Sequence, residues 1–278
     1  MPGSGDLAQV ADLIREVAAA ELVPRFRNLS KDDVRQKRPG DLVTVADVAS
    51  EQRLASGLAK ILPGVPVVGE EAVEADASLL DLIGRSGERC WIVDPLDGTS
   101  NFAAGKATFA IIVALVEDGR TVGGWILDVP NGRMAVALAG QGVTLDGMAM
   151  IGTPPVEPPS GFVGYKIRKA FERQLPAARR SGVGPVSTLR CAGVEYLEIL
   201  AGRATFSIYR RTKPWDHAAG ALMLAEAGGG AVRFDGEGYA PAQQIDAGII
   251  GATSRPALVE VRAAFEALEL PLLQLSED

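Results

Sequence analysis

The sequence predicts a mixed α/β protein with two subdomains, and three observations support this prediction. Apolar residues at helical spacing alternate with short strand-like apolar runs along the chain. Glu117–Arg120 has the composition of a hairpin turn between two such runs, which indicates a sheet that is at least partly antiparallel. The prolines of Gly152–Gly161 are typical of a linker, since proline fits neither a helix interior nor a central strand. We therefore expect subdomains over residues 1–150 and 151–278.

The first half of the chain is predicted to begin with two helices, followed by several strands. One face of the first helix consists of Leu7, Val10, Leu13, Ile14 and Val17. The second helix follows "DLVTVAD" (residues 41–47) and ends at Pro63-Gly64. The predicted strands are "VPVVGEE" (65–71), "CWIVD" (90–94), "TFAIIVALV" (108–116), "TVGGWILDV" (121–129) and "RMAVALAG" (133–140).

The second half continues the alternation of strands and helices. Strands are expected at "GFVGYKI" (161–167), "ATFSIYR" (204–210), "AVRF" (231–234) and "AGIIGAT" (247–253). Helices are expected near "GVEYLEILAGR" (193–203), from Asp216 to Ala227, and after Ser254.

Composition and charge describe a soluble protein with a large core. The chain has 278 residues, of which 47% are hydrophobic and 23% charged. Its net charge of −7 disfavours nucleic acid as a partner, and no apolar run is long enough to cross a membrane. Cys90 and Cys191 lie far apart and form no CxxC motif, and the N-terminus does not resemble a signal peptide. These features predict a reduced, cytoplasmic protein.

Acidic residues follow several of the predicted strands. Glu70 and Glu71 end one strand, Asp94 and Asp97 end another, and Asp216 stands where a strand gives way to a helix. Ligands of α/β proteins bind at such strand ends, so these side chains are expected to converge. Two carboxylates about 4 Å apart repel by roughly 4 kcal/mol at an effective dielectric constant near 20, so convergence favours a bound cation. Oxygen ligands of this kind point to Mg²⁺.

Gly98 and Thr99 follow the two aspartates and open a short helix. The free backbone N–H groups at a helix start suit an anion, so a phosphate ester is the expected ligand. Taken singly, each of these acids has a simpler interpretation. Asp97 and Asp216 fit the role of helix N-caps, and Glu70 fits that of a solvated acid at a strand end. The occurrence of three such places in one chain favours a shared site.

Other phosphate and hydrolase chemistries match less well. "SNFAAGKA" lacks the first glycine and the Ser/Thr of a P-loop, and the two aspartates are three residues apart rather than the one-residue offset of aspartyl-phosphate enzymes. The chain has one histidine and no GxSxG motif, which disfavours a serine-hydrolase triad. Direct attack by water needs no protein nucleophile and agrees with these absences.

Four segments, in order along the chain, resemble the inositol monophosphatase family of magnesium-dependent, lithium-sensitive phosphatases. They are "DLVTVAD" (41–47), "GEE" (69–71), "DPLDGTSNF" (94–102) and "WDHAAGALMLAEAGG" (215–229). The resemblance implies a layered α/β/α/β/α fold, a homodimer, and hydrolysis of a small phosphorylated polyol or sugar. The leading substrate is myo-inositol 1-phosphate. Fructose 1,6-bisphosphate, histidinol phosphate and phosphoadenosine phosphates are alternatives, as is a regulatory protein with little turnover.

The same resemblance assigns roles to individual residues. Glu70, Asp94 and the carbonyl of Leu96 would hold one Mg²⁺; Asp94, Asp97 and Asp216 would hold a second; Glu70 would help to hold a third through waters. Thr99, oriented by Asp47, would polarise the attacking water together with Glu70. The expected substrate contacts are Asp97, Gly98, Thr99, Ala192, Tyr209, Arg211 and Asp216.

The chain departs from the family where the substrate is recognised. Tyr209 replaces a glutamate that reaches the sugar hydroxyls, and "RCAG" replaces a Gly-Ser/Thr-Ala-Ala run, so that either Ala192 alone or Ala192 and Cys191 carry over. Arg210, Arg211 and Lys213 lie nearby and form either a solvated face or a pocket wall for a second anionic group. If these residues form a pocket wall, Tyr209 and Arg211 point inward and Arg210 points outward, because alternate residues of a strand face opposite ways. The protein would then accept a broader range of phosphomonoesters than an inositol-selective relative.

Overall fold

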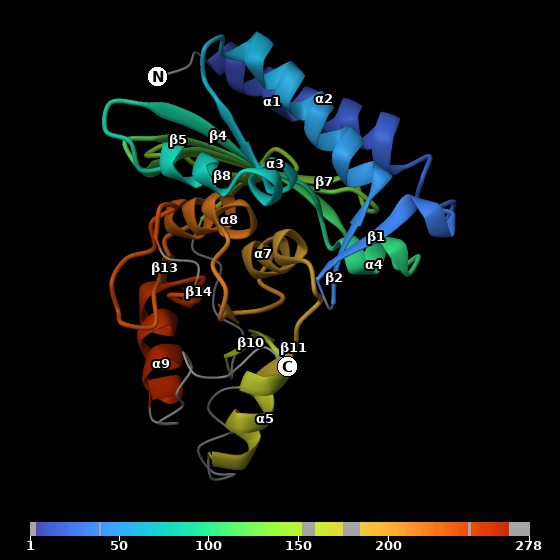
Figure 1. The fold of residues 1–278 in the computed structure, drawn as a ribbon. Helices are drawn as coiled ribbons and strands as arrows, with labels where there is room; N and C mark the ends of the chain where they lie inside the picture. The colour runs from blue at the N-terminus through green and yellow to red at the C-terminus, as the bar shows by residue number, and fades with distance from the viewer. Residues whose placement is uncertain (1–3, 39, 152–158, 175–183, 244–245, 267–278) are drawn as a thin grey trace.

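The computed structural model describes residues 4–38, 40–151, 159–174, 184–243 and 246–266, and these stack in five layers (Figure 1). One outer layer contains α1 (Ser4–Val17) and α2 (Val45–Ile61). Between the two sheets lie α7 (Ala192–Leu200) and α8 (Pro214–Glu226). The opposite outer layer contains α5 (Tyr165–Gln174) and α9 (Arg255–Glu266). The predicted α/β/α/β/α layering is confirmed.

The first sheet has the strand order β3-β4-β5-β6-β7-β8-β9 within the described residues. Its strands are β3 (Val67–Gly69), β4 (Arg89–Asp97), β5 (Ala110–Glu117), β6 (Arg120–Asp128), β7 (Arg133–Leu138), β8 (Gly142–Leu145) and β9 (Met148–Met150). Only the β3–β4 pair is parallel. The predicted hairpin is present, with Glu117 opposite Arg120 and positive φ angles of 51° at Asp118 and 71° at Gly119, as a two-residue hairpin turn requires.

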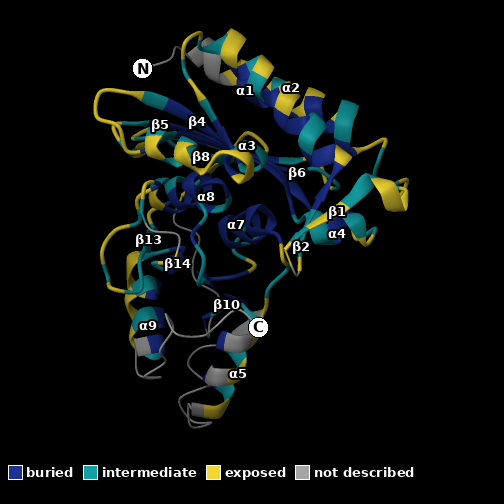
Figure 2. Ribbon diagram, in the orientation of Figure 1, coloured by how far each residue is buried: buried dark blue, intermediate teal, exposed yellow. Residues whose placement is uncertain are grey.

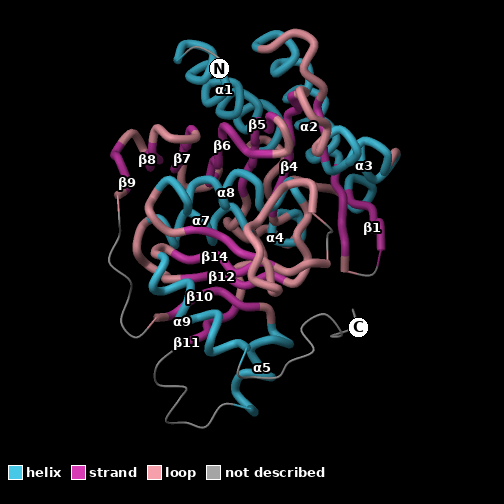
Figure 3. The backbone as a smooth tube through the Cα atoms, turned by 90° about the vertical axis from the view of Figure 1, so that its left-hand side faces the viewer, coloured by secondary structure: helices cyan, strands magenta, loops and turns pink. Residues whose placement is uncertain are grey.

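The second sheet has the order β11-β10-β12-β14-β13. Figure 3 shows β14, β12, β10 and β11 following one another in this order. Its strands are β10 (Ser160–Val163), β11 (Gly184–Ser187), β12 (Phe206–Tyr209), β13 (Gly230–Val232) and β14 (Ile249–Ala252). It mixes parallel and antiparallel pairs. A separate hairpin of β1 (Val34–Arg38) and β2 (Asp41–Thr44) leads into α2.

The two middle helices are buried along most of their length (Figure 2). They pack in one hydrophobic cluster that joins both sheets: it includes Ile92 and Ile112 from the first, Phe162 from the second, and Leu197 and Leu224 from the helices. Burial of apolar surface therefore holds α7 and α8 in place from both sides. Since α8 carries Asp216, this packing also fixes the position of one of the predicted site residues.

Several predicted boundaries need correction. The strand at 65–71 is limited to β3, and Glu70 begins a short helix, α3 (Glu70–Ala75). β4 continues beyond Asp94 to Asp97, with an irregular register between the two. The prediction that 161–167 is a strand is wrong for Tyr165–Ile167, which begin α5 after Gly164 interrupts the strand. Most of the predicted linker, residues 152–158, lies outside the described residues, and the division into two subdomains stays a prediction.

Two further features concern the cysteines and the helices. Cys90 and Cys191 are both buried and free. No helix in the described ranges combines the length and the apolar character needed to cross a membrane.

Candidate active site

The predicted acids come from three elements that meet between the first sheet and the middle helices. Glu70 is the first residue of α3, Asp94 and Asp97 lie at the end of β4, and Asp216 lies in the first turn of α8. Their electrostatic interactions show that they lie close together: burial, followed by the charges of Glu70, Asp97 and Asp216, raises the pKa of Asp94 well above its usual value. The structure thus brings together the four acids predicted from separate segments.

Asp94 is oriented by the backbone that follows it. The Leu96 N–H donates to Asp94 Oδ1 at 3.0 Å, so the peptide turns back on the carboxyl group. Asp94 and Asp216 lie close enough to interact directly: burial raises the pKa of Asp216, and its interaction with Asp94 opposes that shift. The two carboxyl groups therefore belong to one cluster.

Asp97 is anchored by the second half of the chain. The Gly193 N–H donates to Asp97 Oδ2 at 2.6 Å, and the Cys191 thiol donates to the same oxygen at 3.1 Å. Burial, followed by the charge of Asp216, raises the pKa of Asp97 to about 7. Both donors bond to Oδ2, so these contacts fix the orientation of the carboxyl group and do not use Oδ1.

Thr99 and Asp47 are in contact, as the resemblance implies. Thr99 Oγ1 lies 3.0 Å from Asp47 Oδ1 and 2.9 Å from the carbonyl oxygen of Leu96. Asp47 Oδ2 also accepts from the Thr44 N–H and hydroxyl, in a capping box at the start of α2. Burial raises the pKa of Asp47 to about 7. The Thr99 hydroxyl is therefore held between two oxygen acceptors.

Gly98 precedes α4 (Thr99–Ala103) in a conformation that favours glycine. Its φ is 88°, and a Cβ there would lie 2.9 Å from the Thr108 carbonyl oxygen. Another residue would be strained and would crowd the turn. The glycine thus lets β4 turn directly into the helix start that was predicted to face phosphate.

Two lysines contact the acids of α3. Lys213 Nζ lies 3.0 Å from Glu70 Oε1, and Lys37 Nζ lies 2.6 Å from Glu71 Oε1 and 3.8 Å from Glu70 Oε1. Burial lowers the pKa of Lys213, but Glu70 and Asp216 raise it more, so the net shift is upward. Sequence reasoning grouped Lys213 with a basic cluster and missed Lys37, because only the tertiary fold places the β1–β2 hairpin over α3.

The donor set has the chemistry of a site for a hard divalent cation. In the described part of the chain, no group of three or more His, Cys, Asp or Glu side chains is arranged, as it stands, to hold a metal ion. The carboxylates are instead engaged with protein donors. They nevertheless supply only oxygen, and the carboxyl pKa values of Asp94 and Asp97 are raised by burial and by neighbouring acids, a cost that a cation would relieve. The donor set therefore suits Mg²⁺ by its chemistry.

The predicted substrate wall contains an acid that sequence reasoning missed. Tyr209 Oη donates to Glu195 Oε2 at 2.5 Å, and Glu195 also accepts from the Leu189 N–H and the Thr188 hydroxyl. An acidic residue therefore lies beside the tyrosine that replaces the family's glutamate, and it offsets part of the positive charge of Arg210, Arg211 and Lys213. In the sequence, the one indication of this role is that Glu195 is an acidic residue among the apolar residues of the helix predicted near "GVEYLEIL".

Arg211 and Ala192 also lie near the site. The charge of Arg211 lowers the pKa of Asp216, although burial raises it overall, so the guanidinium lies within electrostatic reach of that carboxyl group. Ala192 begins α7, one residue before the amide that holds Asp97. His217, next to Asp216, is buried and bonds to the Tyr196 hydroxyl and the Arg211 carbonyl oxygen.

Clustered acids beside a glycine-led helix start, at strand ends of a layered α/β fold, define the class as phosphoric monoester hydrolases. The model of the inositol monophosphatase family matches residues 6–267, and the chain belongs to this family. The recognition made from the four motifs is confirmed.

Relatives and solved structures agree with this assignment. The chain is 32% identical to the Nus factor SuhB of Pseudomonas aeruginosa over 230 residues, which cover 79% of this chain and 82% of that protein. It is 29% identical to the fructose-1,6-bisphosphatase/inositol-1-monophosphatase of Thermotoga maritima, with 73% and 76% covered. The solved inositol monophosphatase structure from Thermotoga maritima superposes with a TM-score of 0.76 at 25% identity, covering 95% of this chain and 99% of that one.

Proposed function

We propose that the chain is a Mg²⁺-dependent phosphomonoesterase that hydrolyses a small phosphorylated polyol or sugar by direct attack of water. Myo-inositol 1-phosphate is the leading substrate. The observation that carries the proposal is the convergence of Glu70, Asp94, Asp97 and Asp216, whose charges and burial raise the pKa of Asp94. We further propose a cytoplasmic homodimer that lithium inhibits, as the family resemblance implies.

The residues divide the work as follows. Glu70, Asp94, the Leu96 carbonyl, Asp97 and Asp216 would hold Mg²⁺, which when bound lowers the pKa of a water and stabilises charge on the phosphate. Thr99, held by Asp47, orients the attacking water together with Glu70. The amide groups at Gly98 and Thr99 would bind phosphate oxygens. Gly193 and Cys191 keep Asp97 in place for this role.

The metal assignment is tested by Asp94→Asn and Asp97→Asn. Each change keeps the size of the side chain and removes a charge, so kcat should fall by orders of magnitude and Mg²⁺ binding measured by calorimetry should weaken. Asp81→Asn is the matched control, since Asp81 is exposed and distant from these acids in sequence. If either site variant kept more than about half of the wild-type rate at saturating Mg²⁺, the two-aspartate site would be wrong.

The substrate is tested by a panel assayed with Mg²⁺. We compare kcat/KM for myo-inositol 1-phosphate, fructose 1,6-bisphosphate, histidinol phosphate and 3′-phosphoadenosine 5′-phosphate in wild type, Arg211→Ala and the neighbouring control Arg210→Ala. A wall that binds a second anionic group predicts a specific loss for the bisphosphates in Arg211→Ala. If inositol phosphate is preferred by more than about tenfold, or roughly 1.4 kcal/mol, and Arg211→Ala changes nothing, Arg211 belongs to a solvated face.

A second candidate is a regulatory binding protein with little turnover. The relative named as a Nus factor supports it. The buried acids count against it, because a site without turnover has no reason to keep groups that repel one another. Absence of hydrolysis across the whole panel would favour this second reading.

A further inference from the structure

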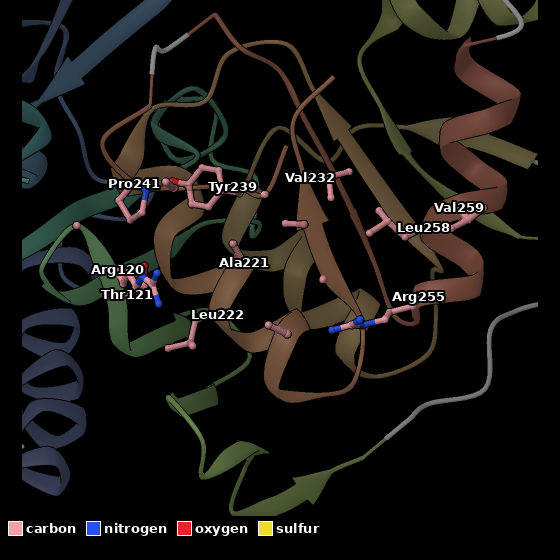
Figure 4. Close-up of a pocket in the computed structure, with 17 residues that line it drawn as sticks. Arg120, Thr121, Ala221, Leu222, Val232, Tyr239, Pro241, Arg255, Leu258 and Val259 are labelled. Carbon is pink, nitrogen blue, oxygen red and sulfur yellow. The ribbon is translucent and has the colours of Figure 1, made fainter. Parts of the chain in front are cut away.

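A cavity lies away from the candidate active site, against the C-terminal part of α8. Its volume is about 710 Å³, within the range of about 300–1,000 Å³ typical of small-molecule sites. It lies among the turn before β6, α8, β13 with the chain that follows it, and the start of α9 (Figure 4). None of the four acids described above lines it.

The lining combines an apolar floor with two cations. Ala221 and Leu222 from α8, Val232 from β13 and Leu258 from α9 supply apolar surface. Arg120 and Arg255 are exposed and come from opposite sides of the cavity, as Figure 4 shows. No aspartate or glutamate is among the lining residues, although the chain as a whole carries a net charge of −7.

The two arginines have no acidic partner among the described residues. Within the described ranges, neither forms an ion pair with a carboxylate, whereas Arg53, Arg89, Arg133 and Arg203 all do. Guanidinium groups recognise carboxylate and phosphate through paired N–H donors. A ligand that satisfies both must therefore carry an anionic group at each end and an apolar body between them.

We infer that this cavity binds a small organic dianion, with an apolar carbon skeleton on Ala221, Leu222 and Leu258 and its two acidic groups on Arg120 and Arg255. A concave cavity of this size suits a small molecule better than a flat macromolecular surface. Charge complementarity and the apolar floor together define the class of ligand.

Two elements join the cavity to the candidate active site. α8 carries Asp216 in its first turn and lines the cavity with Ala221, Leu222 and Ala225 further along. Tyr239 also lines the cavity, while its hydroxyl is buried with no hydrogen-bond partner among the described residues. Burial and the charge of Asp216 raise the pKa of this phenol, so the hydroxyl lies within electrostatic reach of Asp216. Ligand binding is therefore linked to the phosphate site, an inference that rests on the proposed function.

The probe for binding is suberate, a linear eight-carbon dicarboxylate, measured by calorimetry on the full chain at neutral pH. Wild type should bind it saturably, octanoate at least fivefold more weakly, and 1,8-octanediol not at all. Arg120→Gln and Arg255→Gln should each weaken suberate binding at least fivefold. Arg15→Gln, on the exposed side of α1, is the matched control and should bind as wild type does.

A steric variant tests the cavity itself. Ala225 is exposed, so Ala225→Phe should fill the cavity without disturbing the core, and should abolish suberate binding while both arginines remain. Two results would overturn the site. The first is no saturable binding of suberate up to about 10 mM, because a dissociation constant above that value is too weak for a specific site. The second is unchanged binding in Arg120→Gln, Arg255→Gln and Ala225→Phe.

The link to the active site has its own readout. The suberate dissociation constant should change at least twofold when Mg²⁺ and inorganic phosphate are added, because coupling between two sites is reciprocal. Equal constants would overturn the linkage. Binding is measured without turnover, so a chain that binds suberate but hydrolyses no phosphate ester contradicts the proposed function and leaves the cavity site intact.

Discussion

His217 is the single histidine of the chain and lies in the first turn of α8, next to Asp216. Its Nδ1 bonds to the Tyr196 hydroxyl and its Nε2 to the Arg211 carbonyl oxygen, with the ring 4.6 Å from that of Tyr209. Burial lowers the pKa of His217 to about 4, and Lys213 contributes in the same direction. The imidazole therefore acts as a neutral connector between α7, α8 and the segment after β12.

This shift predicts that His217 contributes a loss of stability in mild acid. The unfolded chain binds a proton on histidine near pH 6.5 and the folded chain only near pH 4, so the contribution of His217 to the free energy of unfolding falls as the pH drops from about 6.5 to 4. The raised pKa values of Asp47 and Asp97 contribute in the opposite direction, so the His217 contribution, about 3 kcal/mol, is measured as the difference between the pH profiles of wild type and His217→Gln. In metal-free protein, the one imidazole signal in the NMR spectrum should titrate near pH 4. A midpoint near 6.5 would contradict the assignment.

At the scale of elements, the contact between α7 and α8 depends on a glycine. A Cβ at Gly220 would lie 2.2–2.4 Å from ring atoms of Tyr196, so the two helices approach each other more closely there than an alanine permits. Tyr196 is fully buried, so its ring is surrounded by other protein atoms. The helix accepts the conformational cost of an interior glycine to reach this distance.

Gly220→Ala should therefore destabilise the protein by about 1–3 kcal/mol, although alanine is the better helix former. Ala225→Gly on the exposed face of the same helix is the control, with an expected loss of about 1 kcal/mol from helix propensity alone. Chemical denaturation followed by circular dichroism measures both. A Gly220→Ala variant at least as stable as wild type would show that the Tyr196 ring moves to make room for the methyl group.

At the scale of the whole molecule, one hydrophobic cluster crosses the predicted boundary between subdomains. It joins Val68 and Ile112 of the first half to Leu197, Met223 and Leu224 of the second. We therefore expect one cooperative unfolding transition. Fragments 1–150 and 151–278, expressed separately, should be insoluble or unfolded because each exposes half of this core. Two resolved transitions in calorimetry would contradict this and establish independent subdomains.

The sequence predicts the layers and the acids well, for physical reasons that also explain its failures. Long runs such as Ala110–Glu117 show their strand character in their composition, and Glu70, Asp94 and Asp97 are conspicuous because acids follow apolar strands. Helices as short as α3 and α4 contain too few turns for a periodic pattern. Glu195 and Lys37 acquire their roles through contacts with residues distant in sequence, which spacing alone does not reveal.

The anchoring of Asp97 by Cys191 and Gly193 has a consequence for the time course of synthesis. The donors lie 94 and 96 residues downstream of the carboxyl group that they hold. While the ribosome is still translating the intervening strands, the acids at the end of β4 exist without their partners. The candidate active site is thus completed only when the second half emerges, and a prematurely terminated chain carries Asp94 and Asp97 without the residues that hold Asp97 in place.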